Sequence, residues 1–295
     1  MSIEILINNR FTINKKVGKG SFGDVHLGHD KLTGNLVAIK LEHRDAKLML
    51  KHEFDVYNEI WSSDHKIPRI YWYGNEGEFR VMVMEYLGES LESLFNRCHR
   101  KFSLKTVLMI GIQMFDLIEH LHRKNYVHRD LKPDNFLIGI NDKRFYVHMI
   151  DYGLAKRYKN KQNVHTKFVN GKKLVGTARY ASINSHQGIE LSRRDDLESL
   201  MYILIYFLKG SLPWQGLPGT TREQKYEAIK RHKIKTSMRA LCGGVPEQFY
   251  HFLYYTRNLS FKDKPNYKYL RSLLFGCLEQ NNFKFDFKYD WVKLR

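Results

Sequence analysis

The sequence predicts an α+β protein with two lobes: a small β-rich N-terminal lobe that holds one main helix, and a larger lobe that is mainly helical. Short β-branched or alternating apolar runs separated by glycines occupy the first part of the chain, which is typical of strands and turns. Apolar residues at helical spacing dominate the rest. The chain has 295 residues and is 43% hydrophobic, so it can bury a sizeable core, and disorder is not expected.

The first lobe is expected to contain closely spaced strands. Alternating or β-branched apolar residues predict strands at 11–13, 25–27, 36–40 and 81–86. Glycines interrupt these runs at Gly18, Gly20, Gly23, Gly28 and Gly34. One helix is predicted over 48–60. The last strand leads into a connector, so we expect the first lobe at 1–84, a connecting segment at 85–88 and the second lobe at 89–295.

The second lobe is expected to be built from helices. Residues 104–122 carry apolar side chains at helical spacing, and residues 196–208 are apolar nearly all round, which predicts a central buried helix. A terminal packing helix is predicted over 266–278. The most apolar run, 200–208, is much shorter than the roughly 20 residues of a membrane span. The N-terminus lacks the pattern of a signal peptide, so we expect a soluble, intracellular protein without a membrane anchor.

The chain is strongly basic, with a net charge of +18. This charge favours polyanionic partners such as nucleic acid, anionic membranes, or acidic and phosphorylated proteins, and it does not choose among them. The sequence shows neither an RNA-binding aromatic signature nor a zinc or zipper pattern, so no specific nucleic-acid partner is predicted. Three widely spaced cysteines, Cys98, Cys242 and Cys277, form no disulfide framework and indicate a reducing compartment.

Residues 17–25 read Val-Gly-Lys-Gly-Ser-Phe-Gly-Asp-Val and contain the pattern G-x-G-x-x-G. Alone, the pattern fits a dinucleotide-binding turn, a generic tight turn or a loop that covers phosphates. A dinucleotide-binding turn must open a helix, whereas a strand is predicted from Val25. We therefore expect a β-hairpin whose backbone amides can close over phosphates. Lys40 ends a later apolar strand, where it can reach an anion; a solvated strand end is the alternative.

The richest motif is the run His128-Arg129-Asp130-Leu131-Lys132-Pro133-Asp134-Asn135, followed later by Asp151-Tyr152-Gly153. Asp130 can orient and deprotonate a hydroxyl group, and Lys132 can neutralise a γ-phosphate. Asn135 and Asp151 can hold Mg²⁺ through hard oxygen ligands. These residue types at this spacing predict phosphoryl transfer, and the alternative is a charged surface loop.

With these motifs together, the chain resembles a eukaryotic protein kinase over residues 9–292, and specifically a casein kinase I family Ser/Thr kinase. Ser182-Ile183-Asn184 stands where most kinases have Ala-Pro-Glu. The runs typical of the subfamily are Phe102–Lys105, Ser192–Leu200 and Gly210–Leu217. The resemblance implies the bilobal protein-kinase fold without a separate C-terminal regulatory tail.

The resemblance also implies ATP and Mg²⁺ as cofactors, and a role for each matching residue. Asp130 would be the catalytic base, Lys132 would neutralise the transferring phosphate, and Lys40 would pair with Glu53, with Glu59 as the alternative. Asn135 and Asp151 would bind Mg²⁺, and Asp196 would brace the catalytic loop. Met84 resembles the gatekeeper, and Glu85 and Leu87 resemble the hinge that binds adenine. Nucleotide contacts are implied for Val17, Gly18, Lys19, Gly20, Ser21, Phe22, Gly23, Asp24, Val25, Ala38, Lys40, Met84, Glu85, Leu87, Leu137 and Ile150.

The chain departs from the family pattern in places. Tyr152 replaces the usual phenylalanine, and its hydroxyl needs a partner if it is buried, so we expect an effect on switching rather than on Mg²⁺ binding. The segment around Glu53 is divergent. The chain stops soon after Trp291 and has no terminal cysteine for lipidation, so we expect a constitutively active, unanchored kinase. A monomer is the default expectation for its oligomeric state.

The resemblance implies protein substrates with an acidic residue or a phosphoserine upstream of the target. We place the substrate phosphate at Arg179 and Lys225, and a second anion site at Arg129, Lys156 and Lys172, because a phosphate can accept several charge-assisted hydrogen bonds from such a cluster. A generally solvated basic surface is the alternative.

Two other functions compete with the kinase hypothesis. A pseudokinase scaffold would lack Lys40, Asp130, Asn135 or Asp151, all of which are present. A basic nucleic-acid-binding protein is suggested only by the charge. The run Lys230–Lys235 fits a nuclear localisation signal or a solvated helix end, so we expect nuclear or cytoplasmic localisation, or both. By resemblance alone, a housekeeping signalling role in DNA repair after DNA damage is plausible.

Overall fold

The structure is a computed structural model that describes residues 6–19, 23–63 and 66–294. The chain divides into two units. The first comprises Met1–Glu89 together with Leu137–Gly153, and the second comprises Ser90–Phe136 together with Leu154–Arg295. Residues 137–153 thus belong with the β-rich unit, whereas the sequence analysis assigns them to the helical lobe.

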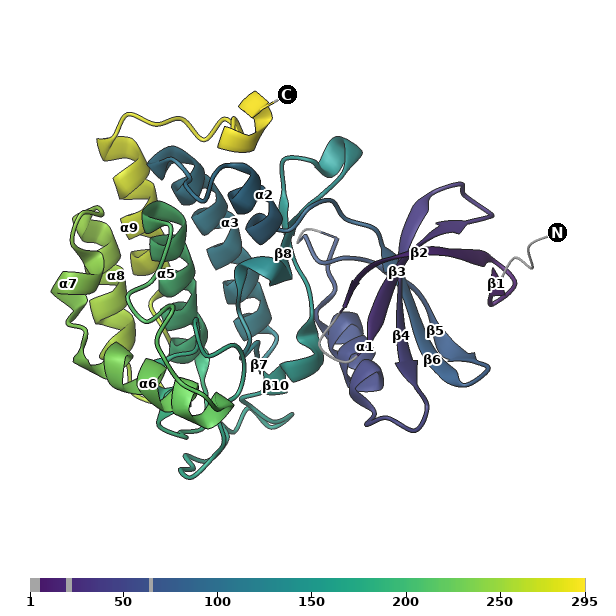
Figure 1. Ribbon diagram of the computed structural model, residues 1–295, viewed down its shortest axis with the longest axis horizontal. Helices are drawn as coiled ribbons and strands as arrows, with labels where there is room; N and C mark the ends of the chain where they lie inside the picture. The colour runs from purple at the N-terminus through teal and green to yellow at the C-terminus, as the bar shows by residue number, and fades with distance from the viewer. Residues whose placement is uncertain (1–5, 20–22, 64–65, 295) are drawn as a thin grey trace. The chain divides into compact units, whose positions relative to one another are not determined.

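An antiparallel sheet of six strands forms the body of the first unit (Figure 1). Its strands are β1 (Leu6–Ile7), β2 (Phe11–Lys19), β3 (Asp24–Asp30), β4 (Leu36–His43), β5 (Ile70–Glu76) and β6 (Phe79–Glu85). They are ordered β1-β2-β3-β4-β6-β5, so β4 lies between the glycine-rich hairpin and β6. This sheet confirms the predicted strands of the first lobe.

The two faces of the sheet have different side chains, because successive residues of a strand point to opposite faces. One face holds a buried apolar cluster of Ile7, Phe11, Val37, Ile39, Val81 and Val83. On β4, the other face carries Lys40 and Glu42, both buried. Helix α1 (Met49–Ile60) is bonded to both of these side chains and buries a stripe of residues at helical spacing: Leu50, Glu53, Val56, Tyr57 and Ile60.

The segment Leu137–Gly153 adds a small hairpin-like pair to the first unit. Strand β8 (Phe136–Ile138) pairs with β9 (Val147–Met149), and the single turn η2 (Asn141–Lys143) lies between them. Two backbone hydrogen bonds attach β8 to the end of the first stretch: the Gly88 N–H donates to Ile138 O at 2.8 Å, and the Ile138 N–H donates to Glu89 O at 3.0 Å. The turn η3 (Tyr152–Leu154) follows directly.

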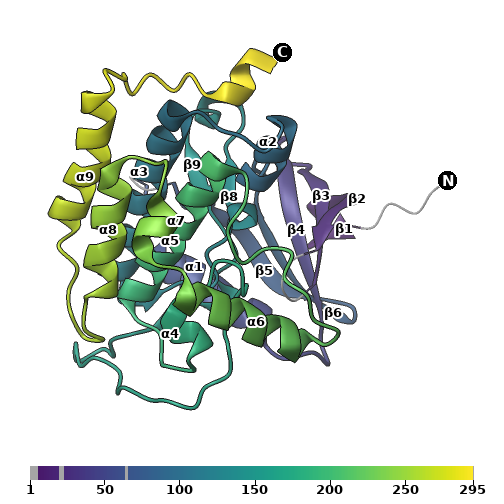
Figure 2. The same cartoon turned by 60° about the vertical axis from the view of Figure 1, so that its left-hand side comes forward.

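Helices form most of the second unit, and both α3 and α8 pack against α5 and α9 (Figures 1 and 2). The helices are α2 (Leu91–Arg97), α3 (Leu104–Arg123), α4 (Ile183–His186), α5 (Arg193–Lys209), α6 (Arg222–Lys235), α7 (Met238–Cys242), α8 (Glu247–Arg257) and α9 (Tyr267–Gln280). Short elements complete it: β7 (Tyr126–Val127), β10 (Lys156–Arg157), η1 (Pro133–Asn135) and η4 (Asp290–Leu294). Strands β7 and β10 pair antiparallel.

Helix α5 is buried along nearly its whole length, as its apolar sequence predicts. It starts at Arg193 rather than Asp196 because Ser192 and Asp195 form a capping box that satisfies the first backbone amides. It ends at Gly210, whose φ of 85° is the left-handed conformation that glycine adopts without strain. The sheet with one helix followed by a mainly helical region confirms the predicted α+β class. No helix in the described ranges is both long and apolar enough to cross a bilayer.

Candidate active site

In the first unit, the structure brings Lys40, Glu53 and Asp151 together. Lys40 Nζ donates to Glu53 Oε2 at 2.6 Å and lies 3.6 Å from Asp151 Oδ1. Lys40 is on β4 and Glu53 on α1, and their exposed fractions are only 6% and 1%. Glu53 rather than Glu59 is therefore the carboxylate that contacts Lys40.

The electrostatics of this cluster favour charged side chains. Burial alone would lower the pKa of Lys40, but the Glu53 and Asp151 carboxylates more than offset it, so the pKa is raised and the ammonium keeps its proton. Burial raises the pKa of Glu53, and the Lys40 ammonium opposes this. Because the two groups are only 2.6 Å apart, we consider Glu53 ionised at neutral pH. The cluster thus presents a buried positive charge beside an acidic side chain.

Two tyrosines fix the backbone around Asp151. The Asp151 N–H donates to the Tyr57 hydroxyl at 3.3 Å, and the Tyr57 and Tyr152 rings meet edge to face with centroids 4.8 Å apart. The buried Tyr152 hydroxyl donates to Met149 O at 3.1 Å, which supplies the partner that its burial requires. Asp151 itself has a φ of 65°, an uncommon conformation for a residue with a side chain. Sequence reasoning did not identify Tyr57.

The glycine-rich segment lies in the β2–β3 hairpin, as predicted from the strand at Val25. Gly20, Ser21 and Phe22 lie outside the described residues, and Lys19 is described only as part of the strand. Gly23 approaches the backbone of β4 closely, since a Cβ atom there would lie 1.8 Å from Leu41 O. This position therefore requires glycine for packing within the sheet.

The residues that the resemblance assigns to adenine also belong to the first unit. Ala38, Leu137 and Ile150 are half-buried, so each keeps some apolar surface that a ring could cover. Met84 and Leu87 are buried. The Glu85 side chain pairs with Lys143, and its backbone N–H donates to Arg69 O at 2.8 Å.

In the second unit, Asp130 is held by hydrogen bonds from a distant segment. Its Oδ1 accepts from both the backbone N–H and the hydroxyl of Thr177, each at 2.8 Å, while Lys132 Nζ lies 3.2 Å from Oδ2. Asn135 Nδ2 donates to Asp130 O at 3.0 Å, so the amide oxygen of Asn135 is the atom that remains for a metal ion. Oxygen from Asn135 and carboxylate from Asp151 are the donor types that Mg²⁺ prefers.

Gly176 lets the segment before Thr177 approach the catalytic loop. It has a φ of 84°, and a Cβ atom there would lie 2.4 Å from Arg129 O and 3.2 Å from Asp130 Oδ1. Arg129, the residue before Asp130, also has a positive φ of 70°. Strained backbone of this kind persists where surrounding bonds over-determine it, and it is enriched at functional sites.

Asp196 on α5 holds the backbone of the same loop, which contains His128 and Arg129, through hydrogen bonds. Its carboxylate accepts the N–H of His128 at 2.8 Å and that of Arg129 at 3.0 Å, and it lies 3.0 Å from His122 Nε2. Burial would raise the pKa of Asp196, but the His122 and backbone hydrogen bonds lower it below its ordinary value. The other ring nitrogen of His122 lies 2.8 Å from the Tyr267 hydroxyl, so α3, α5 and α9 all support the loop.

The basic residues predicted to bind anions all lie in the second unit, where two of them meet at one carboxylate. Lys156 Nζ is 2.9 Å from Glu190 Oε2, and Lys172 bonds to the same oxygen. Burial would raise the pKa of Glu190, but these two lysines lower it overall. Arg129 Nε donates to Leu154 O at 2.7 Å. Lys156 and Lys172 thus already share one carboxylate.

The other two predicted residues, Arg179 and Lys225, lie on segments that a buried lysine connects. The Arg179 guanidinium lies over the rings of Tyr180 and Tyr206, at 5.6 and 5.9 Å from their centroids. Lys233 on α6, 0% exposed, donates to the carbonyl oxygens of Ala178, Arg179 and Ala181 at 3.0, 3.3 and 2.5 Å. Lys225 is on the same helix, where a Cβ atom added at Gly219 would lie 2.8 Å from its Cγ. Sequence reasoning placed Lys233 in a basic surface run and missed this structural role.

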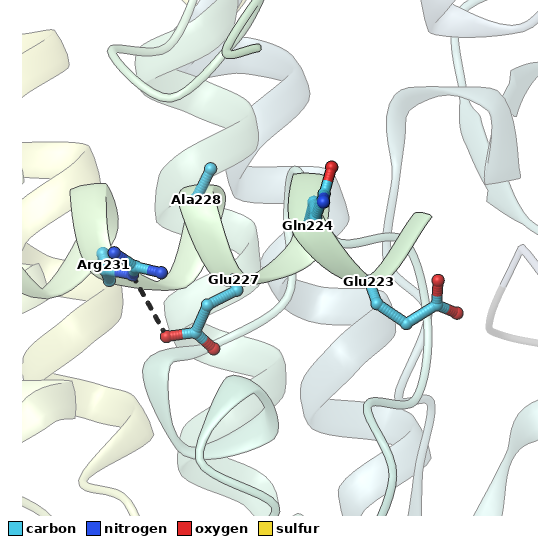
Figure 3. A pocket seen from close by; sticks show the side chains of 5 residues that line it. All are labelled: Glu223, Gln224, Glu227, Ala228 and Arg231. Atoms are coloured by element: carbon cyan, nitrogen blue, oxygen red, sulfur yellow. Dashed lines mark hydrogen bonds and ion pairs between the residues drawn. The ribbon is translucent and has the colours of Figure 1, made fainter. Parts of the chain in front are cut away.

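A cavity of about 420 Å³ lies along helix α6 (Figure 3). Its lining residues are Glu223, Gln224, Glu227, Ala228 and Arg231. Glu227 and Arg231 bond to each other at 3.3 Å along the helix. The lining includes none of the residues predicted for catalysis, nucleotide, metal or anion binding.

A comparison with known protein families gives one match that covers most of the chain. The family described as the protein kinase domain matches residues 11–284.

Proposed function

Since the chain belongs to the protein kinase family, we propose that it is a Ser/Thr kinase of the casein kinase I type, which transfers the γ-phosphate of Mg-ATP to acidic or phosphate-primed proteins. Family membership itself implies phosphoryl transfer to protein substrates. The observation that carries the proposal is the set of hydrogen bonds at Asp130, because a carboxylate held on one oxygen by Thr177 has its second oxygen directed at Lys132.

Asp130 is assigned the role of base toward the substrate hydroxyl, and Lys132 that of a positive charge beside the phosphoryl group. A general base contributes about 10²–10⁴-fold to rate when it is within hydrogen-bond reach of the proton it accepts. Thr177 and Asp196 hold Asp130 and its loop in place, so they act as positioning residues. Lys132 following Asp130 by two residues resembles the Ser/Thr-specific pattern rather than the tyrosine-specific one.

ATP and Mg²⁺ fit the residues present. Asp151 and the amide oxygen of Asn135 would hold the metal ion, which supplies charge neutralisation for the phosphates when bound. Lys40 would contact the α- and β-phosphates, with its ammonium oriented by Glu53. The glycine-rich segment, the hinge residues and the apolar residues around Ala38 would bind the rest of the nucleotide.

The intact Lys40–Glu53 pair supports activity without a separate activating phosphorylation. In protein kinases this pair must be formed for transfer to occur. Here it is formed at 2.6 Å with both groups buried, through a direct contact of the two side chains. The same cluster disfavours a pseudokinase scaffold, which would have lost one of these side chains.

Substrate selection is assigned to the basic residues that the sequence predicts to bind anions. Arg179 and Lys225 would read a phosphoserine or acidic residue upstream of the target, since planar guanidinium groups bind phosphate with two parallel hydrogen bonds. At Arg129, Lys156 and Lys172, an incoming anion would compete with the Glu190 carboxylate. Arg179 and Lys225 are therefore the stronger candidates for binding the substrate phosphate.

The test is transfer of labelled phosphate from Mg-ATP to two matched peptides, one with phosphoserine three residues before the target serine and one without it. We expect transfer to favour the primed peptide. Asp130→Asn should lower kcat at least about 100-fold, because it removes the base. A folded wild-type protein that binds ATP and transfers nothing would refute the proposal.

Arg179→Ala separates anion reading from catalysis in the same assay. It should raise KM for the primed peptide about tenfold or more, the equivalent of one or two charge-assisted hydrogen bonds, and change KM for the unprimed peptide little. The control is Arg222→Ala, which also removes one arginine but does so at an exposed position in the first turn of α6. Equal effects on both peptides would contradict the assignment of Arg179.

A further inference from the structure

Two buried charges in the first unit have no part in the roles assigned above. Glu42 on β4 and Arg80 on β6 are direct cross-strand partners, and Arg80 Nε donates to Glu42 Oε2 at 2.8 Å. Both side chains are buried. The free-energy cost of removing two charges from water is about as large as the gain from their attraction, so a buried ion pair contributes little net stability. The presence of this pair in the sheet therefore needs another explanation.

The second carboxylate oxygen of Glu42 bonds to the start of helix α1. Glu42 Oε1 accepts the N–H groups of Met49 and Leu50, each at 3.1 Å. These are the first two residues of the helix, which has neither a side-chain cap at Leu48 nor an acidic residue in its first turn. Glu42 thus supplies from the sheet the acceptor and the negative charge that a helix start needs.

Arg80 fixes the connector between β4 and α1. Besides Glu42, its guanidinium donates to the carbonyl oxygens of His43 at 3.2 Å, Arg44 at 2.8 Å and Ala46 at 2.7 Å. One arginine therefore holds the end of the strand and the turn that follows it, while Glu42 holds the first turn of the helix. Together the two side chains determine where α1 begins relative to the sheet.

This arrangement acts on Glu53, one helical turn beyond Leu50. Lys40 and Glu42 are two residues apart on β4 and so project from the same face, toward α1. We propose that Glu42 and Arg80 are positioning residues that lock α1 in the orientation in which Glu53 bonds to Lys40, so that the pair forms without a bound partner or a modification. The proposal rests on the proposed function insofar as the Lys40–Glu53 pair serves phosphoryl transfer.

The test compares Glu42→Ala, Glu42→Gln and Arg80→Ala with Arg10→Ala. The control breaks a similar pair in the same sheet, because Arg10 donates to both oxygens of Asp30 at 2.7 and 2.6 Å. We expect Glu42→Ala and Arg80→Ala to lower kcat about tenfold with little change in peptide KM, and to speed amide hydrogen exchange at Met49 and Leu50 about tenfold. Glu42→Gln keeps an oxygen acceptor and should recover most of the activity. Arg10→Ala should lower Tm and leave kcat and α1 exchange unchanged.

Two results would overturn the proposal. One is unchanged exchange at Met49 and Leu50 in Glu42→Ala, or in Arg80→Ala if the Glu42→Ala variant does not fold. The other is a loss of kcat in Arg10→Ala as large as in Glu42→Ala, which would mean that general destabilisation explains the effect. Failure of the wild type to transfer phosphate would instead refute the proposed function, and the exchange comparison would still decide whether Glu42 holds α1.

Discussion

His148 is buried and His186 is half-buried, and both environments favour the neutral imidazole. Burial lowers the pKa of each from 6.5 to about 4, and for His186 the Lys233 ammonium, 3.2 Å from Nε2, acts in the same direction. The unfolded chain takes up a proton near the ordinary value, whereas the folded chain does so only near 4. Between these pH values the unfolded state binds more protons, so stability is lost as pH falls through this window.

Lowering the pH from 7 to 5 should therefore reduce the free energy of unfolding by on the order of 1–2 kcal/mol for each of these histidines. Urea denaturation at both pH values measures the effect. His186→Gln, which cannot take up the proton, should show a smaller loss than the wild type. An identical loss in the two proteins would mean that His186 does not titrate as described.

At the scale of single residues, sequence spacing identifies a side chain best when its role depends on near neighbours in the chain. Asp130, Lys132 and Asn135 lie within one short motif. Sequence spacing does not separate Glu53 from Glu59, because both fall on the predicted helix and only tertiary packing decides which one meets Lys40. Thr177 reaches Asp130 from 47 residues away, and no periodic pattern marks such a contact.

Helix α6 shows the same limit at the scale of an element. Its sequence is rich in lysine and arginine, and the basic run at its end reads as a solvated surface. In the structure Lys233 is buried between the Tyr202 and Trp214 rings, 4.9 Å from each centroid, and its ammonium binds three carbonyl oxygens of residues 178–181. Burial lowers the pKa of Lys233 well below its ordinary value, whereas these carbonyls and ring faces favour the ammonium.

Lys233→Met should destabilise the protein by about 3 kcal/mol, because it leaves buried carbonyl oxygens without their donor. It should also raise KM for the primed peptide, since the backbone of Arg179 loses a hydrogen bond. Chemical denaturation and peptide kinetics measure the two effects. Lys230 is on the same helix and forms a partly exposed ion pair with Glu227. Lys230→Met should change the free energy of unfolding by less than about 0.5 kcal/mol. Similar losses in both variants would contradict a special role for Lys233.

The long elements were predictable for a physical reason. Helix α3 and helix α5 bury many apolar side chains, so their sequences carry a strong pattern, and their observed bounds differ from the predicted ones by only a few residues at capped ends. Helix α6 buries Lys233 and few apolar residues, so a count of hydrophobic positions does not detect it. Arg80 was missed similarly, because a charged residue in a strand is usually assigned to the solvent face.

At the scale of the whole molecule, the net charge of +18 should make substrate binding sensitive to salt. Screening lengths fall from roughly 10 Å at 0.1 M salt to about 3 Å at 1 M, which weakens attraction between exposed charges. We expect KM for an acidic peptide to rise several-fold between these conditions, and KM for an uncharged peptide with the same target serine to change little. Equal changes for the two peptides would show that the basic surface does not select substrates.

The first unit is assembled from two stretches of chain separated by Ser90–Phe136. During synthesis, the six-stranded sheet leaves the ribosome well before β8, β9 and Asp151. At about 5–20 residues per second, the interval between Glu89 and Gly153 lasts several seconds. In that time a nascent chain holds Lys40 and Glu53 but not the acidic residue that lies 3.6 Å from Lys40. The complete charge cluster is therefore a late product of translation, and a fragment that ended at Glu89 would never acquire it.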